Sequence, residues 1–181
     1  MFRKIYNYFN KRNLKDNKYL FLFDEPNDEE FVCFDCETTG LDPKIDDIIS
    51  IGAVIIKNNT IVSSKKFVRF VKPKTDLQAD AIKIHHIRVC DLTNAGDIDN
   101  MINKYLKPML GIKLPNKALE VSAIYHDYKM EIIPQGHIDL RFNTIMDELK
   151  IPNFGKHDAF NDALMTSMIF VKLKNLPNVK I

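Results

Sequence analysis

"FVCFDCETTG", residues 31–40, begins as a buried strand and ends in charge. Its first four residues are apolar or weakly polar, and Asp35 and Glu37 follow at once. Residues i and i+2 of a strand share a face of the sheet, so both carboxylates project together. Close carboxylates repel each other, and a hard divalent cation such as Mg²⁺ relieves that repulsion. The alternative is an exposed strand end with two solvated acids.

Small polar residues complete this stretch. Thr38, Thr39 and Gly40 provide a tight exit from the strand, and glycine allows the backbone to approach a substrate closely. Cys33 and Cys36 form a C-x-x-C motif, but strand positions three apart point to opposite faces. We therefore interpret these cysteines as small core residues rather than as a zinc or redox pair.

Composition is that of an ordinary globular protein. The 181 residues are 45% hydrophobic and 28% charged, which suits one domain with a short appendage. The chain has no apolar run of membrane-spanning length and no signal-peptide pattern at its start, so a cytoplasmic location is expected. A net charge of +2 does not by itself indicate nucleic-acid binding, and three cysteines are too few for a disulfide scaffold.

Charge is concentrated at the N-terminus. Residues 1–28 predict a basic amphipathic extension and an acidic connector, 29–175 the main domain and 176–181 a tail. The extension has apolar side chains at helical spacing among its cations: Phe2, Ile5, Tyr6 and Phe9. It is either a helix docked on the domain or a basic arm that contacts nucleic acid or another protein.

Strand and helix patterns predict a mixed α/β sheet with helices packed over it. A strand at 31–36 precedes a hairpin over 48–72, which turns at Asn58-Asn59 and stops before Pro73. Residues 121–131 read as a strand that runs into a loop. Apolar spacing and capping residues predict four helices: 76–84, 96–110 with Asp97 as N-cap, 139–151 with Asp139 as cap, and 158–177.

A second polar motif, "KHDAFNDAL", lies at 156–164. His157 falls in the loop before the last helix and Asp162 in its early turns, so both can converge on one point. A neutral imidazole suits a general base that deprotonates water. Taken alone this pattern is weak, and a surface histidine beside a helix-face aspartate is the alternative.

Together, "FDCETTG" on a first strand and "HDAFNDAL" on a last helix resemble the DEDD superfamily of 3′–5′ exonucleases. The histidine-containing branch, DEDDh, fits best; it includes the epsilon subunit of bacterial DNA polymerase III and ribonuclease T. The resemblance covers residues 30–172, and "IKIHHIRVCDLTNA" (82–95) resembles the connector after the third strand. It implies a ribonuclease H-like fold and a two-metal mechanism.

By that resemblance, Mg²⁺ or Mn²⁺ ions are held by Asp35, Glu37 and Asp162, and His157 activates the attacking water. The 3′-terminal nucleotide would lie along the first strand, near residues 38–40. The expected activity is 3′–5′ exonucleolytic removal of nucleotides from DNA ends in proofreading or repair. The expected partners are a single-stranded DNA 3′ end and a DNA polymerase subunit, with RNA left open and no membrane.

The chain departs from the family at the second Asp motif, which normally ends an internal strand. No such strand is visible, because residues 91–110 pass from the connector directly into a helical pattern. Either Asp99 or Asp97 stands in as the missing ligand, or the segment is deleted; Asp139 reads better as a helix cap. A deletion motivates a second hypothesis, a catalytically impaired module that binds nucleic acid or protein. The other histidines, such as His126 and His137, are interpreted as structural or exposed.

Overall fold

A mixed sheet forms the centre of the molecule. The computed structural model describes residues 2–15, 17, 20, 23–24, 30–42, 44–97, 118–133, 135–155 and 157–179, with the backbone alone at 2–6 and 97. The strand order is β1-β2-β3-β4, with all neighbours antiparallel except β3 and β4. The strands are β1 (Glu30–Thr38), β2 (Ile48–Lys57), β3 (Thr60–Lys72) and β4 (Gly96–Asp97).

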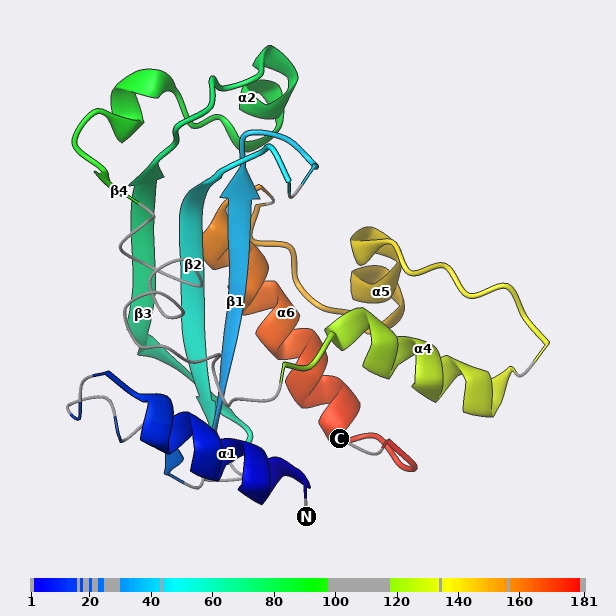
Figure 1. The fold of residues 1–181 in the computed structure, drawn as a ribbon. Helices are drawn as coiled ribbons and strands as arrows, with labels where there is room; N and C mark the ends of the chain where they lie inside the picture. Colours follow the sequence, from blue (N-terminus) through cyan, green and yellow to red (C-terminus); the bar gives the residue numbers. More distant parts are fainter. Residues whose placement is uncertain are drawn as a thin grey trace.

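Helices lie at the ends of the sheet and against it (Figure 1). The long helix α6 packs against β1 and β2, and α4 and α5 pack on α6. In Figure 1, α1 and α2 lie at opposite ends of the sheet. The helical segments are α1 (Phe2–Asn13), α2 (Ala79–His85), the 3₁₀ turn η2 (Val89–Leu92), α4 (Val121–Ile132), α5 (Phe142–Glu148) and α6 (Ala159–Lys174). The predicted α/β class is thereby confirmed.

The β2–β3 hairpin follows from its two turn residues. Asn58 and Asn59 have φ angles of 50° and 60°, the left-handed pair that a two-residue turn between twisted strands requires. β3 ends at Lys72, directly before Pro73, as predicted. Among the described residues, no helix is long and apolar enough to cross a membrane.

Two predictions near β4 have different outcomes. Gly96 and Asp97 pair in parallel with Val71 and Lys72, so the helix predicted to begin at residue 96 is wrong for its first two residues. β4 itself lies in the segment 91–110, where no strand was predicted, but it pairs with β3 rather than with β1. The remainder of that segment and of the predicted helix, from residue 98 on, lies outside the described residues. Within the described part of the chain, β1 and β4 are the two edge strands of the sheet.

Residues 121–131 form the helix α4, so the strand predicted there is wrong. The segment is rich in β-branched and aromatic residues, but its apolar positions repeat with a helical period that buries one face. Glu120 begins the helix by accepting a hydrogen bond from the backbone N–H of Ser122 at 3.3 Å. His126 therefore belongs to a helix rather than to a loop.

The apolar core of the helical layer lies between α4, α5 and α6. Tyr125 is 1% exposed, and its hydroxyl donates a 2.7 Å hydrogen bond to Glu148, which also accepts from Lys129. The core residues are Tyr125, Ile145, Met146, Leu149, Met165, Ile169 and Leu173. The N-cap of α5 is Arg141 rather than Asp139, whose carboxylate instead accepts from the backbone N–H of Arg141 at 3.0 Å.

Candidate metal-binding and catalytic site

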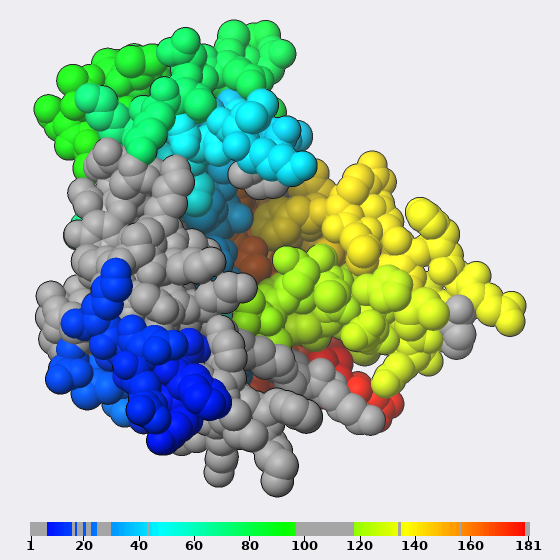
Figure 2. Space-filling model, viewed as in Figure 1, coloured from blue at the N-terminus to red at the C-terminus, as the bar shows by residue number. Residues whose placement is uncertain are grey.

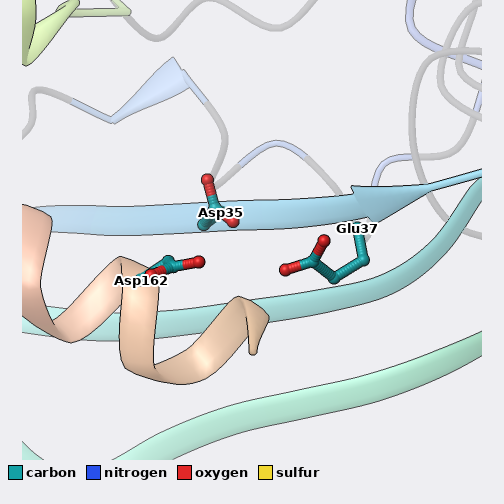
Figure 3. A group of neighbouring side chains, drawn as sticks. All are labelled: Asp35, Glu37 and Asp162. Atoms are coloured by element: carbon teal, nitrogen blue, oxygen red, sulfur yellow. The ribbon is translucent and has the colours of Figure 1, made fainter. Parts of the chain in front are cut away.

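Three carboxylates meet where the end of β1 approaches the start of α6. Asp35, Glu37 and Asp162 each place an oxygen atom within 4.8 Å of the others. In Figure 3 the carboxylates of Asp162, on α6, and Glu37, at the end of β1, point toward each other, and Asp35 lies beside them on β1. The face in Figure 2 is hollowed at this level, with atoms of β1 and α6 on its floor. Residues 125 positions apart in the sequence therefore form one acidic group.

Burial and mutual repulsion raise the proton affinity of these acids. The pKa of Asp35 is raised to about 6, first by burial and then by the negative charge of Asp162. The pKa of Glu37, which is 9% exposed, is raised to about 7 by burial and then by Asp35, Asp162 and Asp158. The group is thus poorly stabilised as three anions by the protein alone.

A glycine allows this close approach. Gly52 of β2 lies opposite Asp35 in the strand register, and a Cβ atom there would lie 2.2 Å from the backbone of Ala159. The first turn of α6 therefore rests directly on the sheet, which brings Asp162 beside β1. A glycine inside an otherwise apolar strand was the available sequence signal for this contact.

Asp158, which was not among the predicted site residues, lies next to the acidic group. It is the N-cap of α6, and its carboxylate accepts hydrogen bonds from the N–H groups of Phe160 at 3.1 Å and Asn161 at 2.9 Å. Its charge also raises the pKa of Glu37. An aspartate directly before a helical repeat is the usual N-cap signal, so it could have been found.

His157 lies beside the acidic group but is not a member of it among the described residues. Its backbone N–H donates a 2.8 Å hydrogen bond to Asp162, and its φ angle of 61° is left-handed. The side chain is exposed. The structure therefore ties the backbone of this histidine to the group and leaves its imidazole accessible from solvent.

The hydroxyl groups of Thr38 and Thr39 form hydrogen bonds within the protein. The Thr38 hydroxyl donates to the carbonyl of Gly40 at 2.6 Å, and Thr39 is fully buried. The predicted contact of these residues with a substrate stays a prediction. Because Thr39 is buried as a whole, only Thr38 and Gly40 of these three residues expose surface that a substrate could meet.

No other acid or thiol of the described residues joins the group. Asp139 lies before α5, where Arg141 and Thr144 donate hydrogen bonds to it. Asp99 is outside the described residues, and only the backbone of Asp97 is described. Cys33 and Cys36 are free, and burial, together with nearby carboxylates, raises their thiol pKa values to about 12 and about 11. Both are therefore protonated, as expected of small packing residues.

The donor set suits a hard divalent cation. Only carboxylate oxygens converge among the described residues, whereas zinc prefers histidine and cysteine ligands. Mg²⁺ and Mn²⁺ take such oxygen ligands, and a cation would compensate the repulsion that raises the pKa values of Asp35 and Glu37. The residues present thus fit a metal of this class.

Comparison with known proteins supplies the family. The sequence matches the exonuclease family over residues 32–132, which is more than half of the chain. The chain belongs to this family. It is also 32% identical, over 162 residues, to the PolC-type DNA polymerase III of Caldanaerobacter subterraneus, with 80% of this chain covered. The matched part of this chain spans only 11% of that relative's length.

Solved structures agree on the fold. The nuclease domain of 3′hExo, a DEDDh family member bound to rAMP, matches with a TM-score of 0.65 at 15% identity, covering 84% of this chain and 96% of that chain. E. coli Exonuclease I in complex with a dT13 oligonucleotide matches with a TM-score of 0.64 at 15% identity, covering 81% and 41%. The ribonuclease H-like fold is confirmed by these structures, and the family match confirms the predicted membership of an exonuclease family; both support nuclease chemistry.

Proposed function

We propose that the chain is a metal-dependent 3′–5′ exonuclease that removes nucleotides from DNA 3′ ends. The observation that carries this proposal is the convergence of Asp35, Glu37 and Asp162 within 4.8 Å at the junction of β1 and α6. Carboxylates in this arrangement suit phosphodiester hydrolysis better than binding alone, because they hold metal ions where charge develops during the reaction.

The three carboxylates, His157 and the end of β1 have separate roles in this proposal. Asp35, Glu37 and Asp162 hold Mg²⁺ or Mn²⁺ through their carboxylate oxygens. When bound, these ions acidify a water molecule and neutralise charge on the reacting phosphate. His157 accepts the proton of the attacking water at an imidazole nitrogen, and its exposure lets water reach it. The backbone of Thr38 and Gly40, on either side of the buried Thr39, receives the 3′-terminal nucleotide.

DNA is the favoured substrate for two reasons. The chain resembles PolC-type DNA polymerase III, and one structural neighbour was solved with a dT13 oligonucleotide. A polymerase is accordingly the proposed protein partner, and the cytoplasm the proposed setting. An RNA substrate is the competing outcome of the test, since another neighbour was solved with rAMP.

A non-catalytic binding module is the second candidate. It is favoured by the size of the acidic group, which holds three carboxylates rather than four in the described part of the chain. Such a module would still bind metal or nucleic acid, but it would not shorten a strand.

The test uses a 5′-labelled single-stranded DNA incubated with the protein and Mn²⁺ or Mg²⁺. Stepwise shortening that a 3′-terminal phosphorothioate blocks supports the proposal, and a parallel RNA strand reports substrate preference. Asp35→Asn removes a charge from the site and should abolish shortening, whereas Asp80→Asn on exposed α2 removes the same charge elsewhere and should not. Binding without shortening by the unaltered protein favours the second candidate.

A further inference from the structure

Thr39 is the centre of a hydrogen-bond network beside the acidic group. Its hydroxyl donates to Asp46 at 3.1 Å, accepts from the backbone N–H of Asp47 at 2.9 Å, and lies 3.1 Å from the hydroxyl of Thr75. Its own N–H donates to the carbonyl of Asp47 at 2.9 Å. Thr39 has no exposed surface, and its hydrogen bonds to Asp46 and Asp47 join the two ends of the loop 39–47.

The carboxylate of Asp47 joins this loop to a second one. One of its oxygens accepts three hydrogen bonds from the turn after β3: from the N–H of Lys74 at 2.8 Å, from the N–H of Thr75 at 2.9 Å and from the hydroxyl of Thr75 at 3.0 Å. Hydrogen bonds to an ionised acceptor are stronger than neutral ones. A single carboxylate therefore holds segments from opposite edges of the antiparallel β1–β2–β3 sheet.

Asp46 packs the other side of the same loop. It accepts from the N–H of Asp42 at 2.8 Å, and a Cβ atom at Gly40 would lie 2.6 Å from its carboxylate. The backbone of Gly40 therefore lies in close contact with the carboxylate of Asp46. Any larger residue at position 40 would push the carboxylate away.

The strand ladder gives little support at this point. The β1–β2 register shifts between Glu37 and Thr38, because Thr38 pairs with Ile48 while Glu37 pairs with Ser50. Such an irregularity interrupts the regular pairing that would otherwise hold the backbone. Beyond Glu37, the path of residues 38–40 thus depends on the network around Thr39 and Asp47.

We propose that Asp47 is a positioning residue that holds the backbone of Thr38 and Gly40, on either side of the buried Thr39, in the geometry that receives the 3′-terminal nucleotide. This inference rests on the proposed exonuclease function, because it assigns the nucleotide to that backbone. The acidic group itself is supported by other contacts, namely β1–β2 pairing at Asp35 and the seating of α6 on Gly52. Loss of Asp47 should therefore disturb nucleotide binding more than metal binding.

The experiment compares Asp47→Ala, Asp47→Asn and the control Asp80→Ala in the full chain. Asp47→Ala should raise KM for a 3′-ended oligonucleotide about 10–100-fold, because misplaced positioning groups cost that much, while kcat and Mn²⁺ affinity change far less. Asp47→Asn retains an acceptor oxygen and should recover most of the loss. Amide hydrogen exchange at residues 39–47 should accelerate in Asp47→Ala alone.

Outcomes separate this inference from the proposed function. Faster exchange with unchanged KM would overturn the positioning role and leave the nuclease proposal standing. Unchanged exchange would show that Asp47 does not hold the loop, whatever the kinetics. If the unaltered protein shortens no strand, the proposed function fails, and calorimetric binding of a nucleoside monophosphate with Mn²⁺ then tests the same positioning role. Equal affinity of all three variants for that nucleotide would overturn it.

Discussion

The two ends of α6 are built on opposite principles. Its first turns carry Asp158 and Asp162 and rest on the sheet through the small residues Ala159 and Ala163, which are 2% and 0% exposed. Its later turns bury larger apolar side chains, Met165, Ile169 and Leu173, against α4 and α5. One end brings like charges together, whereas the other removes apolar surface from water.

This contrast separates stability from chemistry along one helix. Burying apolar side chains stabilises the fold, while gathering carboxylates in a half-buried place destabilises it unless a cation is bound. The apolar end therefore supplies the free energy that allows the acidic end to exist. Substitutions at the acidic end should lower activity without lowering stability, whereas substitutions at the apolar end should lower stability without lowering the activity of the folded protein.

The largest effect is expected at the acidic end. Asp162→Asn removes one of three repelling carboxylates but retains an oxygen that can accept the His157 N–H. We expect nuclease turnover to fall by about 10³-fold, since charge stabilisation at the reacting centre is lost. Unfolding measured without metal should show equal or greater stability. A marked loss of stability in metal-free buffer would contradict the division of roles along α6.

The reciprocal change is made at the apolar end. Leu173→Ala shortens a fully buried side chain and leaves a cavity in the core. It should lower the free energy of unfolding by about 2–5 kcal/mol. Turnover per folded molecule should be unchanged at a temperature well below the unfolding midpoint. Chemical denaturation with a parallel activity assay measures both quantities. The matched control is Lys172→Ala, on the exposed side of the same turn. It should lower the free energy of unfolding only slightly, through loss of the hydrogen bond from Lys172 to the Leu149 carbonyl.

Local periodicity made much of this fold predictable. Alternation along β1 placed Asp35 and Glu37 on one face, and two consecutive asparagines indicated the hairpin turn; both features depend on neighbours in sequence. The boundaries of α6 followed in the same way from its apolar spacing and from the loop residues before it. The acidic group could therefore be anticipated from two short motifs.

Features set by distant contacts were missed. Val121, Ile124 and Tyr125 suit a strand by composition, and packing on α6 decides for the helix α4. Likewise, Thr39 was expected to face a substrate, but the loop closes on a turn 36 residues away and buries its hydroxyl. The helical spacing of apolar residues was the available local signal for α4. The contact of Thr39 leaves no such signal, because its partner segment is distant in sequence.

The smallest effect expected is a pH dependence that belongs to the acidic end alone. The pKa values of Asp35 and Glu37 rise on folding from 3.8 and 4.5 to about 6 and about 7. Between these limits the folded state binds more protons than the unfolded state, so metal-free stability falls as the pH rises from 4.5 to 7.5. The combined loss is on the order of 2–3 kcal/mol, since the two sites are coupled and partly hydrated.

A variant isolates this contribution from other titrations. Burial lowers the pKa of His85, which opposes the trend because protonation of this residue favours unfolding at low pH. The free energy of unfolding of the unaltered protein and of Asp35→Asn is measured by urea denaturation in a chelator from pH 4.5 to 7.5. The contribution of His85 is the same in both proteins, so it cancels in the difference between the two free energies. That difference should shrink toward pH 4.5, and Mn²⁺ should stabilise the unaltered protein more at pH 7.5 than at pH 5. A flat difference would mean that Asp35 ionises in the folded protein as readily as in water, and the repulsion attributed to the acidic end of α6 would then be absent.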